Sequence, residues 1–347
     1  MGRNNMEFTT DFKHWLQIQS RDARWCILIN ADPDALASAM ALRRILRPRS
    51  RVVDIAHINA VTRPDNLAMI RYLRIPLTPW QPEIALHYNH FALLDSQPQH
   101  SHLYAGLQFH LIIDHHPATN LSGQTAPDAF ISLCPGAGAT ATLMTRLLRS
   151  LGIRPGPLLA TALIYGIRTD TATLERSGGE SDLRAYQWLS RHANSTLLRR
   201  ISRSEYLREW LPLFSRAFRS LVDCQGGGAH ASLEEVKSAD LLVSIADFFT
   251  RVHGLKWIAV SGVVAKTVVV IFRGDGGRDI GNMAKLCFGD MGEAGGHRTL
   301  ARAEFPLNSL PEGVKAAGFV RWRLQSHGRR KDRQNNGKDA GASGATR

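Results

Sequence analysis

The chain has 347 residues, of which 43 are Lys or Arg and 30 are Asp or Glu, so its formal net charge is +13 and its pI is near 10.1. The hydrophobic fraction of 44% and the charged fraction of 21% are typical of a globular protein and exclude a largely disordered chain. Polar residues or glycines interrupt every long apolar run, and the first residues include no apolar segment. We therefore expect neither a membrane helix nor a secretory signal.

The first half of the chain alternates short apolar runs with amphipathic patterns. Apolar runs of this length predict strands that are buried on both faces. The predicted strands cover residues 25–30, 51–58, 91–95 and 109–114. The predicted helices cover residues 35–46, 65–73, 140–151 and 158–165. This alternation predicts an α/β fold, in which a mainly parallel sheet is flanked by helices.

The second half predicts a smaller α+β domain. Residues 181–223 read as charged helices, and the glycine run at 224–228 favours a domain boundary. After it come a helix over 241–250, two strands over 257–264 and 267–272, a helix over 280–288, a glycine-rich turn at 295–297 and a strand over 301–306. From residue 326 the chain is basic and has no apolar side chain larger than Ala, which predicts a disordered tail.

Cysteine usage and charge bear on location and partners. Cys26, Cys134, Cys224 and Cys287 are scattered and form no CxxC pair, which favours free thiols and a cytoplasmic location. The positive charge favours a polyanionic partner, although a basic surface without a nucleic-acid role has the same composition.

Acidic and histidine residues follow the predicted strands, where ligands collect in open α/β sheets. They are Asp32, Asp34, Asp95, Asp114, His115 and His116, and Asp170 follows the helix predicted at 158–165. Each has an ordinary alternative: Asp32 and Asp34 suit a helix N-cap, the histidines a solvated pair, and Asp95 and Asp170 turns. As a set, they suit a pair of bridged Mn²⁺ or Mg²⁺ ions.

Four ordered motifs resemble those of the DHH phosphoesterase superfamily. They are ADPDALAS at 31–38, ALLDS at 92–96, IIDHHP at 112–117 and GIRTDT at 166–171, and GGH at 295–297 resembles the mark of a DHHA1 domain. The resemblance implies a DHH catalytic domain at 20–190, a helical linker at 191–227, a DHHA1 substrate-binding domain at 228–325 and the tail at 326–347.

The resemblance also implies a role for each matching residue. Asp32 and Asp34 would each bind one of two divalent ions, Mn²⁺ being favoured over Mg²⁺, with Asp95 bridging both. His115 and Asp170 would complete the second site. His116 would face the scissile phosphate, and Asp114 would orient the histidines. In the second domain, Arg273, Gly295, Gly296 and His297 would hold a substrate phosphate or sugar.

The chain departs from the superfamily pattern at the first motif. Many relatives have a metal-binding His four residues before the first aspartate, where this chain has Leu28. Asn30 lies two residues before Asp32, where RecJ-like members have an aspartate, and its amide oxygen is a neutral candidate ligand. Glu293 and Ala294 stand where a longer glycine run is usual, which weakens the expected phosphate grip.

The resemblance to the nanoRNase and pAp phosphatase branch implies an enzyme that hydrolyses short oligoribonucleotides, and also pAp, by in-line attack of a metal-bound hydroxide. An alternative is a phosphodiesterase for dinucleotides such as c-di-AMP or pGpG. A third is a nucleic-acid-binding protein with an impaired metal site. The expected partners are short RNA or nucleotides and not a membrane, and any oligomer is expected to be a homodimer.

Overall fold

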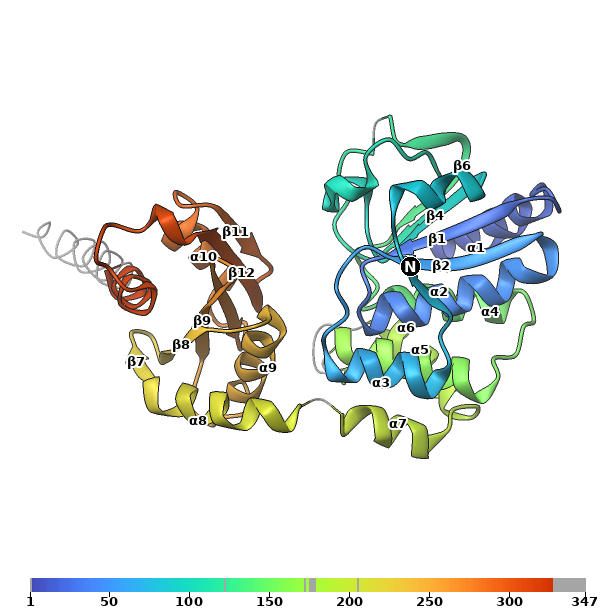
Figure 1. Cartoon of the computed structure of the whole chain (residues 1–347). Coiled ribbons are helices and arrows are strands. Elements are labelled where there is room, and N and C mark those ends of the chain that lie inside the picture. The colour runs from blue at the N-terminus through green and yellow to red at the C-terminus, as the bar shows by residue number, and fades with distance from the viewer. Residues whose placement is uncertain (1, 122, 172, 175–178, 205, 327–347) are drawn as a thin grey trace, which may run out of the picture. The chain divides into compact units, whose positions relative to one another are not determined.

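The structure is a computed structural model that describes residues 2–121, 123–171, 173–174, 179–204 and 206–326 (Figure 1). The chain divides into two compact units, Met1–Glu205 and Tyr206–Arg347, and each unit has its own hydrophobic core. Apart from residue 326, the tail predicted to be disordered lies outside the described residues.

The first unit is built on six parallel strands, which confirms the predicted α/β fold. The strands are β1 (Arg24–Ile29), β2 (Val52–His57), β3 (Leu77–Pro79), β4 (His90–Leu94), β5 (Phe109–Asp114) and β6 (Thr125–Leu133). Their order in the sheet is β3-β2-β1-β4-β5-β6. The chain therefore runs outward from β1 in one direction and from β4 in the other. This places a topological switch point between β1 and β4.

The two faces of this sheet are covered differently. Trp25, Ile27 and Ile29 pack into the core that the helices share, whereas Cys26 and Leu28 face a second core on the other side. The helices on the first face are α1 (Gly2–Gln17), α2 (Pro33–Leu46), α3 (Pro64–Leu73), α4 (Thr140–Ser150), α5 (Pro157–Asp170), α6 (Glu180–Ser190) and α7 (Ser195–Ser202). Crossovers between parallel strands are right-handed, so the β4–β5 connection falls on the opposite face. It contains only the short 3-10 segments 98–100 and 102–104, and Tyr104 fills the second core.

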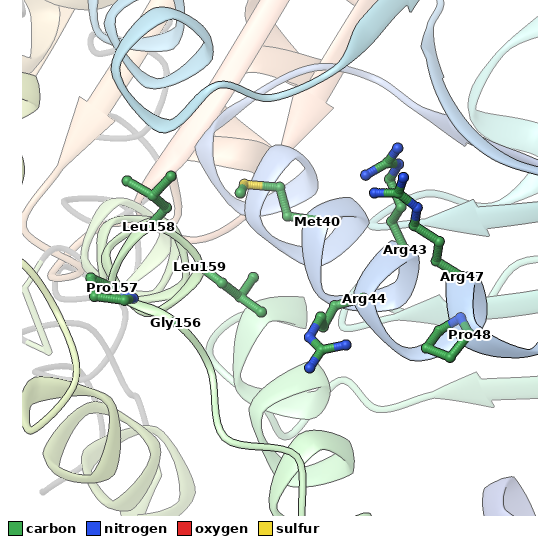
Figure 2. Close-up of a pocket in the computed structure, with 9 residues that line it drawn as sticks. All are labelled: Met40, Arg43, Arg44, Arg47, Pro48, Gly156, Pro157, Leu158 and Leu159. Carbon is green, nitrogen blue, oxygen red and sulfur yellow. The ribbon is translucent and has the colours of Figure 1, made fainter.

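Helices α2 and α5 pack closely together and run in opposite directions. The contact depends on Gly166, because a Cβ atom there would lie 3.0 Å from Cα of Asp34 and 3.1 Å from the carbonyl oxygen of Pro33. The start of α2 therefore lies beside the end of α5. The opposite ends of the two helices frame an open pocket (Figure 2).

The second unit is a mixed sheet with helices on both faces. Its strands are β7 (Val222–Cys224), β8 (Gly228–Glu235), β9 (Trp257–Val264), β10 (Thr267–Gly274), β11 (Glu293–Gly296) and β12 (Leu300–Pro306). They follow the order β11-β12-β10-β9-β8-β7, in which only β8 and β9 pair in parallel among the described residues. Helices α8 (Leu211–Ser220) and α9 (Ala239–Phe249) cover one face, and α10 (Ile280–Phe288) covers the other.

The glycine run that favours a domain boundary lies inside this second unit. It forms the turn of the β7–β8 hairpin, where Gly226 and Gly227 have φ angles of 72° and 71°. Two consecutive positive φ angles suit a tight hairpin turn whose twist matches the strands. The glycine run at 224–228 therefore forms a turn within a sheet. Across the described part of both units, no helix combines the length and the apolar character that a membrane span requires.

Candidate metal centre

The acidic and histidine residues of the four motifs meet at one edge of the first sheet. Asp32 and Asp34 follow β1, Asp95 follows β4, and Asp114 ends β5. Parallel strands have their carboxyl ends at the same edge, and β1 and β4 flank the switch point. The fold therefore brings together residues that lie up to 82 positions apart in these three motifs, at the place where α/β sheets bind ligands.

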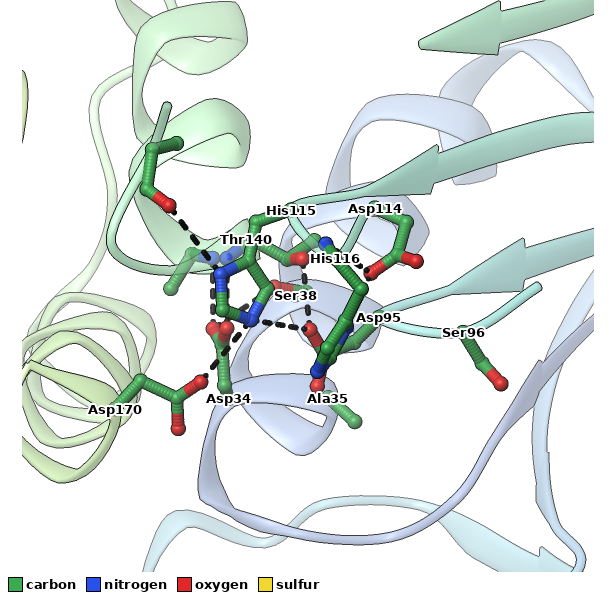
Figure 3. A network of polar contacts seen from close by, with 12 residues as sticks. Asp34, Ala35, Ser38, Asp95, Ser96, Asp114, His115, His116, Thr140 and Asp170 are labelled. Carbon is green, nitrogen blue, oxygen red and sulfur yellow. Dashed lines mark hydrogen bonds and ion pairs between the residues drawn. The ribbon is translucent and has the colours of Figure 1, made fainter. Parts of the chain in front are cut away.

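Asp34 is fully buried and is held by the first turn of α4 (Figure 3). Its carboxylate accepts hydrogen bonds from the backbone N–H groups of Thr140 (2.6 Å) and Ala141 (2.7 Å). Burial and the nearby charge of Asp170 nevertheless hold the pKa of Asp34 well above its usual range. In the absence of a cation, an ionised Asp34 is therefore unfavourable despite its two backbone donors.

Asp32 caps α2, as the N-cap alternative predicts. Its Oδ1 accepts a hydrogen bond of 2.9 Å from the backbone N–H of Ala35, and its backbone is extended. Burial, followed by the charge of Asp170, raises the pKa of Asp32 to about 6. Capping and metal binding are compatible, because the cap uses one lone pair of a carboxylate that has several.

Asp95 occupies a left-handed backbone conformation with φ of 57°, directly after β4. Aspartate tolerates this region better than most residues. Its Oδ1 accepts a hydrogen bond of 2.8 Å from the hydroxyl of Thr140 and lies 3.4 Å from Nε2 of His115. Burial and the charge of Asp34 hold the pKa of Asp95 well above its usual range.

His115 lies at the centre of these carboxylates. Its Nε2 is 3.2 Å from Oδ2 of Asp170 and 3.4 Å from Oδ1 of Asp95, while its Nδ1 lies 3.3 Å from the carbonyl oxygen of Ala137. Burial alone would lower the pKa of His115, but Asp170 and Asp34 outweigh it and raise the pKa to about 9. The buried Nε2 nevertheless has no well-aligned hydrogen bond within the described part of the chain.

Asp114 and His116 form a separate pair beside this cluster. Nδ1 of His116 lies 2.8 Å from Oδ1 of Asp114, which is fully buried at the end of β5. The other carboxylate oxygen accepts a hydrogen bond of 2.7 Å from the amide of Gln97. Burial would raise the pKa of Asp114, but hydrogen bonds from His116 and Gln97 outweigh it and lower the pKa. Asp114 is thus a fixed anion that orients one of the two histidines.

The titratable ligand atoms form two overlapping groups. In the described residues, Asp34, His115 and Asp170 form one group and Asp95, His115 and His116 the other, with the atoms of each lying within 4.8 Å of one another. Adjacent ligands of a six-coordinate Mg²⁺ or Mn²⁺ ion are about 3 Å apart, since metal–oxygen distances are about 2.1 Å. The 3.2 and 3.4 Å contacts of His115 match that spacing. The buried carboxylates and the unpartnered nitrogen therefore fit a hard divalent ion.

Asp32 and Asn30, the other candidate ligands after β1, are not members of these groups, which contain only acidic, histidine or cysteine side chains. Asp32 belongs to neither, and its side chain caps α2. Asn30 follows the last residue of β1 and is exposed. Leu28 is fully buried in the core beneath the 3-10 segments. A histidine at position 28 would thus enter the apolar face of the sheet, away from the helices.

The predicted substrate residue Arg273 lies near the end of β10 and is already paired. Its Nε donates a hydrogen bond of 2.6 Å to Oδ1 of Asp247 on α9, and its NH1 donates to the carbonyl oxygen of Phe272. Its side chain is 13% exposed. A substrate phosphate would have to compete with Asp247 for this guanidinium.

The predicted glycine-rich turn is in fact the end of a strand. Gly295 and Gly296 belong to β11, where Gly296 pairs with Ala301, and His297 follows as an exposed residue. The strand requires glycine at these positions for a steric reason. A Cβ atom on Gly296 (φ 143°) would lie 2.3 Å from the carbonyl oxygen of Leu300, and one on Gly281 would lie 2.3 Å from the carbonyl oxygen of Gly296. These glycines permit close backbone packing between β11, β12 and the start of α10.

Several residues that support the site carry no sequence signal of their own. Gln97 is fully buried, and its side chain links Asp114 to the backbone of Pro117 and Thr119. The buried carboxylate of Asp182 accepts hydrogen bonds from the N–H of Gly138 and from the hydroxyl of Thr142, and it thereby fixes the loop before α4. Only a three-dimensional arrangement shows these contacts, because each residue is an ordinary polar residue in a loop or helix.

No protein-family model matches the chain. Among curated proteins, Uncharacterized protein MJ1633 of Methanocaldococcus jannaschii is 31% identical over 280 residues, which cover 80% of this chain and 57% of that protein. The chain thus spans little more than half the length of this relative.

A solved structure shows the fold of this chain. An exopolyphosphatase-related protein from Bacteroides fragilis aligns over 94% of this chain and 98% of its own, with a TM-score of 0.71 and 15% identity. RecJ from Thermus thermophilus in complex with Mn²⁺ aligns over 94% of this chain and 55% of its own, with a TM-score of 0.49 and 15% identity. The first likeness shows that the chain has the fold of this exopolyphosphatase-related protein.

Proposed function

We propose that the first unit is a divalent-metal-dependent phosphoesterase. The observation that carries the proposal is the environment of His115, whose buried Nε2 faces the carboxylates of Asp95 and Asp170 without a well-aligned hydrogen bond. Asp34, Asp95, His115 and Asp170 would hold the metal, and Asp32 lies close enough to Asp170 to raise the local negative charge. Divalent ions in such a site lower the pKa of water and neutralise charge on a phosphoryl group.

Other side chains of the site position the proposed metal ligands or face the substrate. Thr140 positions Asp95 through its hydroxyl and Asp34 through its backbone N–H. Asp114 fixes the ring of His116 through Nδ1, so its other ring nitrogen, Nε2, is the atom available to donate a proton or a hydrogen bond to a phosphoryl oxygen. The side chain of His116 is 35% exposed, so a substrate can reach it.

We further propose that the substrates are short oligoribonucleotides, with pAp as a related substrate. The motifs resemble the nanoRNase and pAp phosphatase branch, and the net charge of +13 favours a polyanion. The second unit would bind one end of the substrate through exposed His297 and the nearby glycines, and through Arg273 once it leaves Asp247. The proposed units of function are thus a catalytic first unit and a substrate-binding second unit.

Hydrolysis of a substrate panel in Mn²⁺ tests both the phosphoesterase activity and the proposed substrates. The panel contains RNA of two, five and about twenty nucleotides, pGpG, c-di-AMP and pAp. We expect turnover of the two shortest RNAs, and its loss in Asp95→Asn, because asparagine keeps the shape and tolerates the left-handed backbone but lacks the charge. The matched control is Asp22→Asn, which removes the same charge from an exposed position.

Each other outcome has a distinct meaning. Turnover of only pGpG or c-di-AMP would keep the phosphoesterase and replace its substrate by dinucleotides. Equal activity of the wild-type chain and Asp95→Asn would refute the metal centre. Tight binding of the long RNA without turnover of any substrate would refute the enzyme and favour a nucleic-acid-binding protein.

A further inference from the structure

A pocket of about 710 Å³ lies at the far ends of the helix pair that carries the metal centre (Figure 2). Helix α2 begins at the centre, and its last turns line the pocket, while α5 begins at the pocket and ends at Asp170. Each helix has 14 residues, so it separates the two places by roughly 15–20 Å at 1.5 Å per residue. The lining residues are Met40, Arg43, Arg44, Arg47, Pro48, Gly156, Pro157, Leu158 and Leu159.

The polar side chains of this pocket are all cationic. Arg43, Arg44 and Arg47 line it, no acidic residue does, and none of the ion pairs found in the described part of the chain uses these three arginines. The Nε of Arg43 donates a hydrogen bond of 3.0 Å to the carbonyl oxygen of Val53, which anchors its guanidinium at the pocket wall.

Two of the arginines lie close enough for their charges to interact. Burial and the charge of Arg47 lower the pKa of Arg43, and these effects outweigh the opposing negative charge of Asp54. Figure 2 shows the guanidinium groups of Arg43 and Arg47 together on one side of α2, with Arg44 directed toward the start of α5. Like charges in one pocket cost free energy that an anionic ligand would remove, and guanidinium groups bind phosphate oxygens in a bidentate manner.

The remaining lining is apolar. Met40, Leu158 and Leu159 form one side of the pocket, and two prolines extend it. The N-cap residue of α5, Gly156, has no side chain to satisfy the first backbone N–H groups of the helix. The pocket therefore offers an apolar surface for a flat ring beside cationic groups and a helix N-terminus for phosphate.

We propose that this pocket binds a nucleotide, with its phosphate on the arginines and its base on the apolar side formed by Met40, Leu158 and Leu159. An inorganic anion alone would leave the apolar side unused, and an uncharged nucleoside would leave the arginines unpaired. The site is separate from the metal centre and does not depend on the proposed hydrolase activity. It gives the first unit a second place at which to sense or retain nucleotides.

Calorimetric binding of AMP to the full chain in EDTA tests the proposal. Without a divalent ion, the carboxylates of the metal centre repel the phosphate, so the centre contributes no binding. We expect AMP to bind and its affinity to fall about tenfold or more in the double variant Arg44→Gln/Arg47→Gln, since each charge-assisted hydrogen bond to the phosphate strengthens binding by about tenfold or more. Both arginines are exposed, so the variant should fold, and its thermal unfolding temperature verifies this.

Control variants and control ligands show whether AMP binds at this pocket. Arg49→Gln removes the same charge from the same 3-10 segment at a residue that does not line the pocket, and it should leave the affinity unchanged. His297→Ala separates this site from the proposed substrate-binding residues of the second unit: AMP binding that is lost in His297→Ala but kept in Arg44→Gln/Arg47→Gln would place the nucleotide on the second unit and overturn the proposal. Adenosine and orthophosphate should each bind at least about tenfold more weakly than AMP.

Three further results would overturn the proposal. If the double variant binds AMP as tightly as the wild-type chain, the arginines are not its site. If orthophosphate binds as tightly as AMP, the apolar side takes no part and the ligand is a simple anion. Absence of AMP binding at millimolar concentration would refute the site altogether.

Discussion

Asp34 combines two roles whose electrostatic demands conflict. It accepts two backbone hydrogen bonds at the start of α4, which favour its charge, yet burial beside Asp170 and Asp32 disfavours that charge. The balance lies on the unfavourable side, because the pKa of Asp34 is raised well above its usual range. A cation would reverse this balance, as expected of a residue selected for metal binding at some cost in stability.

This conflict predicts the behaviour of Asp34→Asn. Without metal, the variant should be less stable than the wild-type chain, because the two oxygens of Asp34 accept from two different backbone N–H groups and the amide nitrogen of asparagine leaves one of these buried donors without an acceptor. Its affinity for Mn²⁺ should fall at least about tenfold. Thermal unfolding in EDTA and in Mn²⁺ measures both effects, with Asp22→Asn as the exposed control. A wild-type response to Mn²⁺ would contradict this role for Asp34.

Metal uptake should release protons from the centre. The pKa of His115 is raised to about 9, so the metal-free protein holds a proton on this ring at pH 7, and the pKa values of Asp34 and Asp95 are raised as well. Metal ligands must be deprotonated, so Mn²⁺ binding expels such protons. Calorimetry in buffers of different ionisation enthalpy should report at least one proton released at pH 7.

The proton count has its own control. His115→Gln should reduce the number of protons released by about one, whereas His253→Gln, at an exposed position of the second unit, should not change it. Metal binding without proton release would contradict the raised pKa of His115. It would show that the ring of His115 is already neutral at pH 7 before the metal binds.

At the scale of whole elements, the position of α5 depends on one missing side chain. Gly166 lies one helical turn before Asp170, and a Cβ atom there would meet the backbone of Asp34 and Pro33 at about 3 Å. Because neither contact is the end of a flexible side chain, α5 would have to move away from α2. A shift of α5 changes the distance of Asp170 from His115 directly.

Gly166→Ala should therefore weaken the metal centre. Alanine gains about 1 kcal/mol in helix propensity, but overpacking costs about 1–3 kcal/mol, so we expect a net loss of stability. Mn²⁺ affinity should fall about tenfold or more through displacement of Asp170. Gly318→Ala, a helical position with open space around it, isolates the propensity effect and should slightly stabilise the chain. Unchanged Mn²⁺ affinity in Gly166→Ala would show that α5 tolerates the methyl group.

The observed helices and strands show which elements can be predicted from local sequence. Strands β1, β2, β4 and β5 and helices α2 to α5 follow from apolar runs and helical spacing, because each contributes buried residues to the core of the first unit. Strands β3 and β6 are not among the predicted elements, because β3 has only three residues and β6 is mostly half-buried or exposed and has no continuous apolar run. Helix α1 is not among the predicted elements, although Phe8, Phe12 and Trp15 have helical spacing and pack on β6 and β1. The prediction of a turn at β11 is wrong, because glycine composition does not distinguish a turn from a strand packed closely against a helix.

The residues of the candidate site can be predicted from the sequence, but most of their contacts cannot. Motif order places Asp34, Asp95, His115 and Asp170 on separate elements that share one edge of the sheet. Sequence spacing does not reveal that Asp247 occupies the guanidinium of Arg273, since 26 residues separate them. The contacts of Gln97 with Asp114 are likewise set by the β4–β5 crossover, whose path local composition does not determine.

At the scale of the whole molecule, the two units have separate cores and different titrating groups. His230 is buried in β8 of the second unit, where Nε2 lies 2.8 Å from the hydroxyl of Ser261. Burial, followed by the charge of Arg321, lowers the pKa of His230 to about 4. The unfolded chain binds this proton below its ordinary pKa of about 6.5, so stability from neutral His230 is lost as pH falls from about 6.5 to about 4.

Calorimetry should accordingly resolve two unfolding transitions. Mn²⁺ should raise the temperature of one transition, that of the first unit, and Asp95→Asn should abolish this shift. The other transition should lose on the order of 2 kcal/mol through His230 between pH 7 and pH 5, and His230→Gln should reduce that loss. A single transition that moves as a whole with Mn²⁺ would show that the units unfold together.

The hydrogen bonds between Asp34 and the first turn of α4 have a consequence for how the chain acquires its structure. They join residues 106 and 107 positions apart, and the six-stranded parallel sheet between them contains only non-local strand pairs. Such a topology folds slowly, because long loops must close before their contacts stabilise anything. During synthesis, the carboxylates of β1 and β4 emerge well before Thr140 and Asp170. The proposed metal centre would therefore assemble late in the folding of the first unit, and binding of a divalent ion would report that its carboxylates and His115 have come together.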